Sequence, residues 1–217
     1  MIHKAAEHAP SDFTVDVSSD GQNWTTIRKV VGANALPSEL MLPDLQTRYL
    51  RLAFAGATAP ATVSKIGILE TAVGASPNAF WKHRATRARK GVFPRNLLEE
   101  QSYWTVMGQP GDAREALMNE EGQIEVAARG VSLEPFVLRG DQLLTWADAS
   151  HEQSLRDGWI PIPTVVRTYN GLELRVTAFA AGAAGASNLH AAYVLQNTSP
   201  DGVEGRMIVA VRPLQVL

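Results

Sequence analysis

Residues 162–199 contain three successive runs in which apolar and polar residues alternate, and Asn170-Gly171 separates the first run from the second. A period of two is typical of strands that bury one face. Asn-Gly between two such runs is a strong signal for a two-residue β-hairpin, because both residues tolerate a positive φ. This part of the chain is therefore constrained to form an antiparallel sheet.

The rest of the C-terminal half carries further strand signals. Gly and Asp residues separate the runs, at 119–122 and 139–142 among other places, and Ser199-Pro200-Asp201-Gly202 marks a longer turn. The additional predicted strands are 102–108, 123–129, 132–138, 143–149 and 206–217. Residues 101–217 are thus predicted to form an antiparallel β-sandwich of about eight strands.

The N-terminal part is also predicted to be β. Residues 13–17 alternate, Asp20-Gly21 signals a turn, and 25–31 form a second run. Further strands are predicted around Tyr49–Leu52 and within 61–71. No helical stretch interrupts these strands, so 1–72 is predicted to be a separate β domain.

Residues 73–100 have a different character. Ser76-Pro77 is a helix-start signal, and Gly91 followed by Pro94 is a helix-stop signal, which predicts a short helix near 78–90. Seven basic side chains follow one another here: Lys82, His83, Arg84, Arg87, Arg89, Lys90 and Arg95. A solvated surface or a clamp between domains is the plainer interpretation of this basic linker, and a polyanion site is the alternative, partly offset by Glu99 and Glu100.

Composition excludes several classes of function. A net charge of −2 gives no electrostatic basis for nucleic-acid binding, and no apolar run is long enough for a membrane helix. The absence of cysteine excludes disulfides and thiol catalysis. The first ten residues lack the apolar core of a signal peptide. If a longer parent protein is periplasmic or secreted, we expect its signal outside this chain.

Cofactor and metal motifs are likewise not found. The chain has neither a phosphate-binding loop nor the G-x-S-x-G nucleophile pattern. Its histidines, at 3, 8, 83, 151 and 190, show no metal-ligand spacing. We therefore expect no cofactor and no metal.

Residues 13–70 resemble the C-terminal half of a discoidin domain, also called the coagulation-factor type C domain. The matching segments are FTVDVSSDGQNWTTI, TRYLRLAF and VSKIGILE. The motif positions are Ser19, Asp20, Gly21, Trp24, Arg48, Tyr49, Arg51 and Glu70. The resemblance implies an incomplete β-sandwich in which Trp24 is a core residue and Arg51 pairs within the fold, while several ligand-binding loops belong to the half that is absent.

Residues 76–217 resemble the sandwich that precedes a glucoamylase-like (α/α)6 glycosidase barrel in large bacterial proteins. The segments that carry this are FPRN, QSYWTVMG, EALMNEEGQIE, SLEPFV, TWADASHEQSLRDGWIPIPTV, LELRVTAFAAG and RPLQV. The resemblance implies that the chain is an accessory part of a carbohydrate-active protein whose catalytic acids lie on a barrel outside this chain.

The stretch 145–163 is the main candidate for chemistry. Its acids are Asp148, Glu152 and Asp157, and Glu120, Glu121 and Glu134 lie nearby in sequence. Glycoside hydrolysis needs two carboxylates roughly 5–10 Å apart across a sugar, and loop spacing alone does not place any two of these face to face.

The same stretch holds a candidate glycan-binding set: Trp146, Asp148, Trp159 and Arg167. Sugars stack on exposed tryptophan rings with polar groups at the edges. Packing is the competing interpretation, since Trp146 alternates with Leu144 and two isoleucines follow Trp159. The prolines at 161 and 163 remove two backbone donors, which predicts an edge segment or a crossing between sheets.

These observations predict an all-β protein: a partial discoidin-like β-sandwich (1–72) and a second antiparallel β-sandwich (101–217), joined by a short helical linker (73–100). The leading functional hypothesis is a non-catalytic accessory module with a carbohydrate and a downstream catalytic barrel as partners. The alternatives are a glycoside hydrolase or lyase acting through acids near 148–157, and a truncated structural domain without activity.

Overall fold

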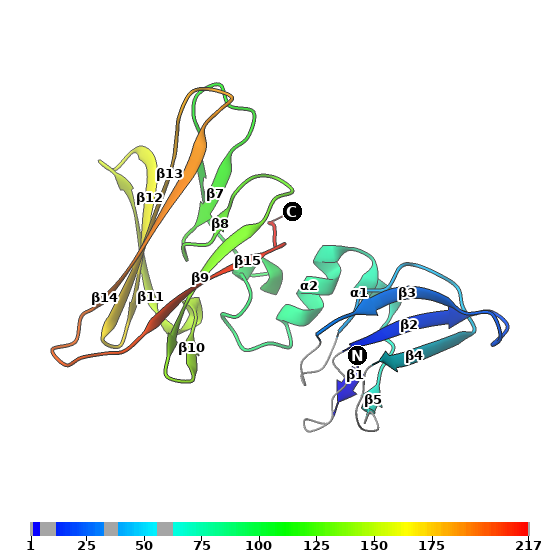
Figure 1. Ribbon diagram of the computed structural model, residues 1–217. Coiled ribbons are helices and arrows are strands. Elements are labelled where there is room, and N and C mark those ends of the chain that lie inside the picture. The colour runs from blue at the N-terminus through cyan, green and yellow to red at the C-terminus, as the bar shows by residue number, and fades with distance from the viewer. Residues whose placement is uncertain (1, 5–11, 33–38, 56–62, 217) are drawn as a thin grey trace. The chain divides into compact units, whose positions relative to one another are not determined.

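The computed structural model describes residues 2–4, 12–32, 39–55 and 63–216. The chain divides into two compact units, residues 1–80 (unit 1) and 81–217 (unit 2). The boundary falls inside helix α2 (Pro77–Ala85), within the segment predicted as a linker. The protein is mostly β, with antiparallel sheets and a short helical segment between them (Figure 1), which confirms the predicted fold class.

Unit 1 is built on a three-stranded antiparallel sheet in the order β3-β2-β4, with β1 and β5 forming a separate pair. The elements are β1 (Ile2–Lys4), β2 (Asp12–Ser18), β3 (Thr25–Val30), β4 (Tyr49–Ala55), β5 (Val63–Ile66) and the one-turn helix α1 (Thr71–Gly74). Phe13 and Val15 of the central strand are buried and form the centre of its apolar core. The strands predicted for this region are all present.

The turn between β2 and β3 is organised by Asp20. Its carboxylate accepts hydrogen bonds from the backbone N–H groups of Gln22 and Asn23, both at 2.8 Å, and from the Ser18 hydroxyl at 2.9 Å. These donors hold the pKa of Asp20 well below its usual value. The Asp20-Gly21 signal therefore marks a real turn, in which Gly21 takes a φ of 77°.

Arg51 pairs within unit 1. Its Nη2 lies 3.0 Å from the buried carboxylate of Asp16, and its guanidinium is 4.2 Å from the centroid of the Trp24 ring. Arg51 therefore stabilises the sheet through an ion pair and a cation–π contact.

The linker helix begins as the sequence predicts. The Ser76 hydroxyl accepts the Ala79 N–H at 3.1 Å, and Pro77 occupies the first turn. The helix ends at Ala85, five residues earlier than expected, and a short 3₁₀ helix, η1 (Arg95–Leu98), follows.

Four side chains of the basic run pair with carboxylates inside unit 2. Lys82 contacts Glu99, Arg89 contacts Asp148, Lys90 contacts Glu100 and Arg95 contacts Glu121, at distances of 2.5–3.3 Å. The basic linker is therefore largely neutralised by internal acids, which favours a structural role over a polyanion site.

Unit 2 consists of two antiparallel sheets that face each other (Figure 1). The first sheet has the order β10-β9-β8-β7-β6, with β15 paired to β9, and the second sheet has the order β11-β12-β13-β14. Its strands are β6 (Trp104–Met107), β7 (Ala116–Asn119), β8 (Ile124–Glu125), β9 (Ser132–Arg139), β10 (Gln142–Leu144), β11 (Ser150–Arg156), β12 (Ile160–Tyr169), β13 (Leu172–Ala181), β14 (Asn188–Asn197) and β15 (Arg206–Arg212).

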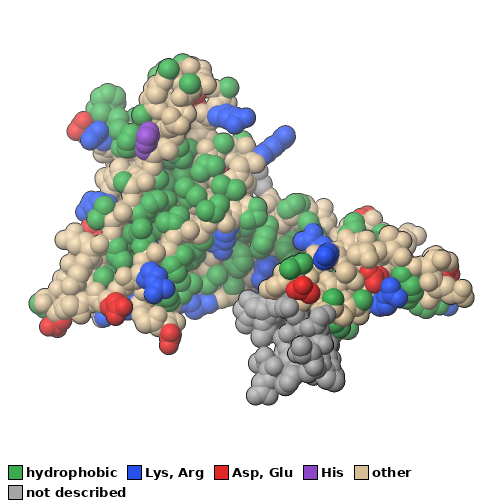
Figure 2. Space-filling view, viewed as in Figure 1, with side chains coloured by type: hydrophobic (Ala, Val, Ile, Leu, Met, Phe, Trp, Pro, Cys, Tyr) green, Lys and Arg blue, Asp and Glu red, His purple; other side chains and the backbone are tan. Residues whose placement is uncertain are grey.

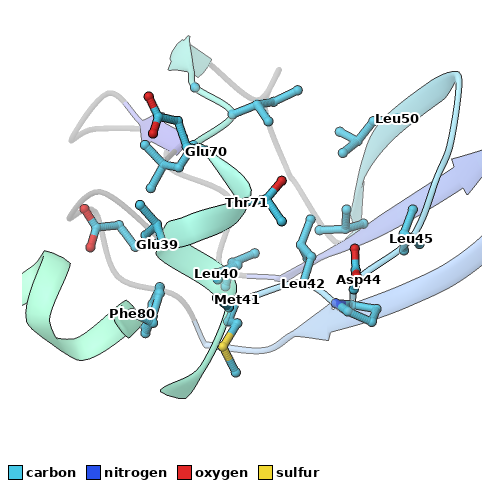
Figure 3. Close-up of a pocket in the computed structure, with 18 of the residues that line it drawn as sticks. Glu39, Leu40, Met41, Leu42, Asp44, Leu45, Leu50, Glu70, Thr71 and Phe80 are labelled. Carbon is cyan, nitrogen blue, oxygen red and sulfur yellow. The ribbon is translucent and has the colours of Figure 1, made fainter. Parts of the chain in front are cut away.

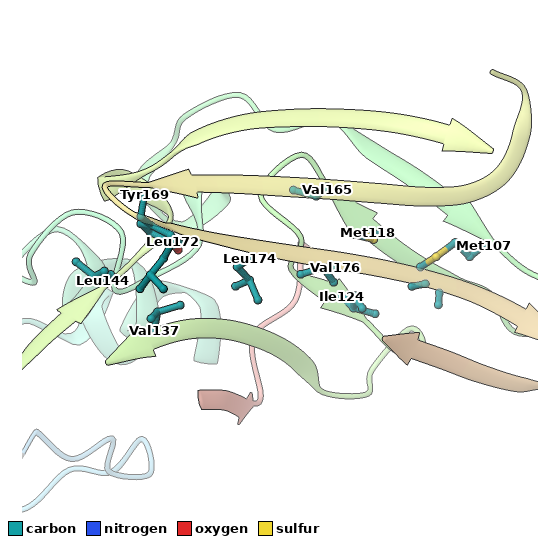
Figure 4. Packing of buried hydrophobic residues seen from close by; sticks show 12 residues of the cluster. Met107, Met118, Ile124, Val137, Leu144, Val165, Tyr169, Leu172, Leu174 and Val176 are labelled. Carbon is teal, nitrogen blue, oxygen red and sulfur yellow. The ribbon is translucent and has the colours of Figure 1, made fainter. Parts of the chain in front are cut away.

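The core of unit 2 fills the space between these sheets. Met118, Ile124 and Val137 come from one sheet, and Leu174 and Val176 come from the other; all five have fully buried side chains (Figure 4). Alternation along β12 and β13 places one side of each strand in this core, as the period of two predicts. Asn170-Gly171 forms the β12–β13 turn, with Tyr169 opposite Leu172.

Several segments of unit 2 differ from the prediction. Residues 116–119 form strand β7 where none is predicted, and the strand predicted over 123–129 is only Ile124–Glu125. Residues 150–156, where the sequence predicts no strand, form strand β11, because their backbone pairs with β12 even though most of their side chains face water. Residues 143–149, expected to be a strand, leave the sheet at Leu144 and form the 3₁₀ helix η2 (Trp146–Asp148).

The two prolines lie in the first half of β12. Residues 160–163 pair only with β11, across a register shift between Leu155 and Arg156, and pairing with β13 begins at Thr164. β12 is a central strand as a whole, but its proline segment pairs with a strand on one side only. On the other side no strand needs the backbone N–H groups that the prolines lack, so no sheet hydrogen bond is lost there.

Candidate functional site

Trp146 is buried, with 6% of its surface exposed. Its indole Nε1–H donates to the Phe93 carbonyl at 2.9 Å, and the Arg95 guanidinium and Lys90 ammonium lie 4.7 and 5.6 Å from its ring centroid. The indole is thus closed in by the segment that follows the linker helix, and its ring faces are not available as a sugar platform.

Asp148 completes a capping box at η2. Its Oδ2 accepts the backbone N–H of Thr145 at 2.7 Å and the Thr145 hydroxyl at 2.8 Å, while Oδ1 lies 3.1 Å from Arg89 Nη1. Burial by itself would raise the pKa of Asp148, but the two Thr145 donors and Arg89 outweigh it and hold the pKa below its usual value. Asp148 is therefore an ionised structural carboxylate.

Arg167 projects from β12 into the interior and bridges the two sheets. Only 2% of it is exposed; its Nε donates to the Glu121 carbonyl and its Nη1 to the Pro135 carbonyl, both at 2.7 Å. A buried guanidinium is tolerated when its donors are satisfied and a carboxylate is near. Glu121 supplies the nearby carboxylate as well as the carbonyl. The same carboxylate is fully buried and also binds Arg95 Nε at 2.5 Å.

Glu121 is at the centre of a buried polar cluster. Asn119 Nδ2 donates to Glu121 Oε2 at 2.9 Å and to Gln123 Oε1 at 3.2 Å. Burial raises the pKa of Glu121, and the bond to Arg95 opposes that rise. Among the described residues, Gln123 Nε2 has no hydrogen-bond partner.

A small cavity of about 10 Å³ adjoins this cluster and is lined by both Trp146 and Arg167. Its other lining residues are Pro94, Asn119, Glu121, Gln123, Glu134, Pro135 and Phe136. A cavity of this size has room for about one water molecule and is far smaller than the several hundred Å³ of a ligand pocket. Two of the four candidate ligand residues are thus brought together, but in the interior.

His151 is opposite Arg167 in the β11–β12 register and is partly buried. Burial, with the positive charges of Arg167 and Arg95, lowers its pKa to about 4, although Glu120 acts in the other direction. The imidazole is therefore neutral at physiological pH, and its Nε2 has no hydrogen-bond partner among the described residues.

Two further buried acids, Glu125 on β8 and Glu134 on β9, lie near each other. Glu134 binds the Arg212 guanidinium, with Nε at 2.9 Å, and accepts the Ser132 hydroxyl at 2.8 Å. Glu125 has no ion pair among the described residues; burial raises its pKa to about 7, and the Glu134 charge adds to the rise against a backbone hydrogen bond from Val216. The alternating run 123–129 predicts that Glu125 lies on a strand. It does not predict that both faces of this strand are buried.

The Glu125 pKa has a consequence for stability. The folded chain holds one more proton than the unfolded chain between pH 4.5 and about 7, so the free energy of unfolding should fall as pH rises through this window and stay lower above it. Glu125→Gln has no carboxyl group to titrate at this position, so its free energy of unfolding should not show this fall. The free energy of unfolding of the variant, relative to that of the wild-type chain, should increase by about 2 kcal/mol from pH 5 to pH 8, measured by urea unfolding at each pH.

The matched control is Glu152→Gln, which removes an exposed carboxylate from β11. Its stability should follow the wild-type pH profile. A Glu125→Gln profile parallel to wild type would contradict the assignment of the buried proton to Glu125.

Trp159 contrasts with Trp146 because 75% of its surface is exposed. It follows the β11–β12 turn, in which Asp157 and Gly158 both take left-handed conformations, with φ of 53° and 81°. The Gly158 N–H donates to the Leu155 carbonyl at 3.0 Å and the Trp159 N–H to the Arg156 carbonyl at 3.3 Å. The ring is therefore held at the end of a tight hairpin with most of its surface open to water.

Unit 1 holds a larger pocket, of about 500 Å³ (Figure 3). Leu40, Leu42 and Leu50 are among its apolar lining residues, and Glu39 and Glu70 also line it. Among the lining residues that the structure describes there is no lysine, arginine or histidine. Its volume is in the range of ligand pockets, but few of its groups can donate a hydrogen bond to a polar ligand.

Within the part of the chain that the structure describes, no three His, Asp or Glu side chains are grouped as metal ligands would be. None of the described helices is long and apolar enough to span a membrane.

Comparison with protein-family models, curated proteins and solved structures finds no match for this chain. The class of protein that the fold defines is accordingly a mostly-β protein with several antiparallel sheets. The resemblances to a discoidin domain and to a glycosidase-supporting sandwich depend on their motif residues alone.

Proposed function

We propose that this chain is a non-catalytic accessory module of a carbohydrate-active protein and that it contacts glycan through Trp159. The observation that carries the proposal is the 75% exposure of this indole at a tight hairpin. An exposed tryptophan offers a flat apolar surface to the C–H face of a sugar ring, and it loses little conformational entropy when its backbone is already fixed.

The neighbours of Trp159 suit the same ligand. Arg156 and Asp157, adjacent in the turn, are exposed and provide hydrogen-bond donors and acceptors for sugar hydroxyls. Trp146, Asp148 and Arg167, the other members of the predicted binding set, have internal partners instead. The proposal therefore reduces the candidate site to the turn at 156–159.

The environment of three of the candidate acids supports a non-catalytic role. Asp148, Glu121 and Glu134 are engaged in ion pairs or capping, and the cavity beside the last two is too small for a sugar ring. A glycosidase needs both carboxylates to face the scissile bond across open space. In the parent protein, chemistry is then the task of a catalytic barrel beside this sandwich, as the resemblance of 76–217 implies.

Trp159→Ala tests the proposal. The full chain is screened on an array of α- and β-glucans and other polysaccharides, and the best ligand is titrated by calorimetry. We expect Trp159→Ala to weaken binding at least about tenfold, the equivalent of losing roughly 1.4 kcal/mol of stacking, with an unchanged melting temperature.

Tyr103→Ala is the matched control, because Tyr103 is an aromatic side chain of unit 2 with 63% exposure. It should bind like wild type. Full binding by Trp159→Ala would overturn the glycan contact, and cleavage of the bound glycan, lost in Glu152→Gln, would replace the accessory role with the hydrolase or lyase alternative.

A further inference from the structure

Strand β14 is the edge of the four-stranded sheet in unit 2 and has no obvious protection against pairing. Its sequence, NLHAAYVLQN, contains no lysine, arginine, aspartate, glutamate, proline or glycine. All ten residues pair with β13 in one unbroken register. The other long side of this strand is free of any strand partner among the described residues.

The other edges of the longer sheets carry the devices that block edge-to-edge pairing. β11 contains Glu152 and Arg156 and a register shift, and β3 contains Arg28 and Lys29. β15 has arginines at both ends, β4 contains Arg51, and β6 and β10 are only four and three residues long. Within the described sheets of three or more strands, β14 is therefore the long edge without charge or interruption.

The side chains beside this edge are apolar and incompletely covered. Leu189, Tyr193 and Leu195 point toward the core and pack against it, but each is only partly buried. On the outer face, Val194 is 53% exposed. Because these core-facing side chains are partly exposed to solvent, the sandwich does not fully bury its core along β14.

The neighbouring edge of the other sheet continues this surface. On β15, Met207 and Val211 stand opposite the core residues Val137 and Leu133 in the register, so they share the inner face of that sheet. They are nevertheless 37% and 64% exposed. Figure 2 shows hydrophobic side chains gathered on unit 2 in the region where β14 and β9–β15 face each other.

We propose that β14 is a self-association edge, which pairs antiparallel with β14 of a second copy and joins the two four-stranded sheets into one. A second copy fits because an antiparallel pair of identical strands has two-fold symmetry, so the same donors and acceptors satisfy each other. A strand without lysine, arginine, aspartate or glutamate places no such like charges opposite one another, whereas a symmetric pair of β3 or of β15, whose charged residues are all basic, would do so. The half-open residues beside the edge lose water in the same step.

This inference goes beyond the proposed glycan contact and does not depend on it. Trp159 belongs to the β11–β12 hairpin, and β11 is the opposite edge of the same sheet. A dimer through β14 leaves that hairpin uncovered.

Ala192→Lys tests the self-association. Ala192 is exposed, lies in the middle of β14 and is opposite the uncharged Thr177, so a lysine there costs the monomer little. In a symmetric pair the two lysines stand close together, and lysine is the residue that natural edges use to prevent pairing. We expect wild-type chain to approach twice its 23.5 kDa mass in sedimentation equilibrium as concentration rises, and Ala192→Lys to raise the dimer dissociation constant at least about tenfold.

Ser154→Lys is the control, with the same charge added at an exposed position of the opposite edge, β11. It should dimerise like wild type, and circular dichroism should give all three chains the same melting temperature when they are monomeric. Amide hydrogen exchange gives a readout without any variant, because β14 amides should become more protected as the wild-type concentration rises. A monomeric wild-type chain, an undiminished dimer of Ala192→Lys, or equal loss in both variants would overturn the proposal.

Discussion

Truncation of Trp146 to alanine is expected to lower the free energy of unfolding of unit 2 by about 3–5 kcal/mol. The indole is 6% exposed, and its removal leaves a cavity between η2 and the segment around Phe93. The Phe93 carbonyl also loses its donor, and two cations lose the ring beneath them. Urea unfolding followed by circular dichroism measures the loss.

Trp159→Ala is the paired control, since it removes the same side chain from an exposed hairpin. Its unfolding free energy should stay within about 0.5 kcal/mol of wild type. Equal destabilisation by the two truncations would contradict the assignment of Trp146 to packing and Trp159 to the surface.

Arg167→Met is expected to cost about 2–4 kcal/mol, although methionine has a similar length and is apolar. Replacing a buried ion by an apolar side chain is often neutral when the whole ion pair is removed. Here the carbonyls of Glu121 and Pro135 would stay buried without their donor. The same denaturation experiment applies, with Arg175→Met on the exposed outer face as the control.

A second readout identifies the electrostatic part of this effect. The Arg167 charge helps to hold the pKa of His151 down near 4, so Arg167→Met should move that pKa upward, measured from the imidazole proton shifts by NMR. An unchanged His151 titration together with unchanged stability would show that Arg167 does not bridge the sheets.

The sequence predicts most of unit 2 because its strands follow local rules. Alternation and the Asn170-Gly171 turn are sufficient to predict β12 and β13, and they are confirmed in register. β11 was missed because SHEQSLR has the polarity of a loop, and an edge strand with one partner does not need an apolar face. Its strand character comes from backbone pairing, which side-chain patterns do not reveal.

The candidate site is less predictable for a related reason. Neither the sequence around Trp146 nor that around Trp159 shows which indole is buried. Trp146 is buried through its contacts with Phe93 and Arg95, about fifty residues earlier in the chain. Arg167, by contrast, had a local signal: it is two residues from Val165 and Tyr169, so a period of two places it on the buried side of β12. A charged residue at such a position indicates an internal partner.

The packing of Leu214 has a consequence for how unit 2 is made. Leu214 is buried together with Ala85, Phe93 and Leu97, and the Gln215 carbonyl accepts a hydrogen bond from Asn96, 119 residues earlier. The segment of unit 2 that leaves the ribosome first is thus held by one that leaves more than a hundred residues later. Contacts of such long range slow folding, so we expect the segment around Phe93 and Leu97 to become stably packed only after Leu214 has been synthesised.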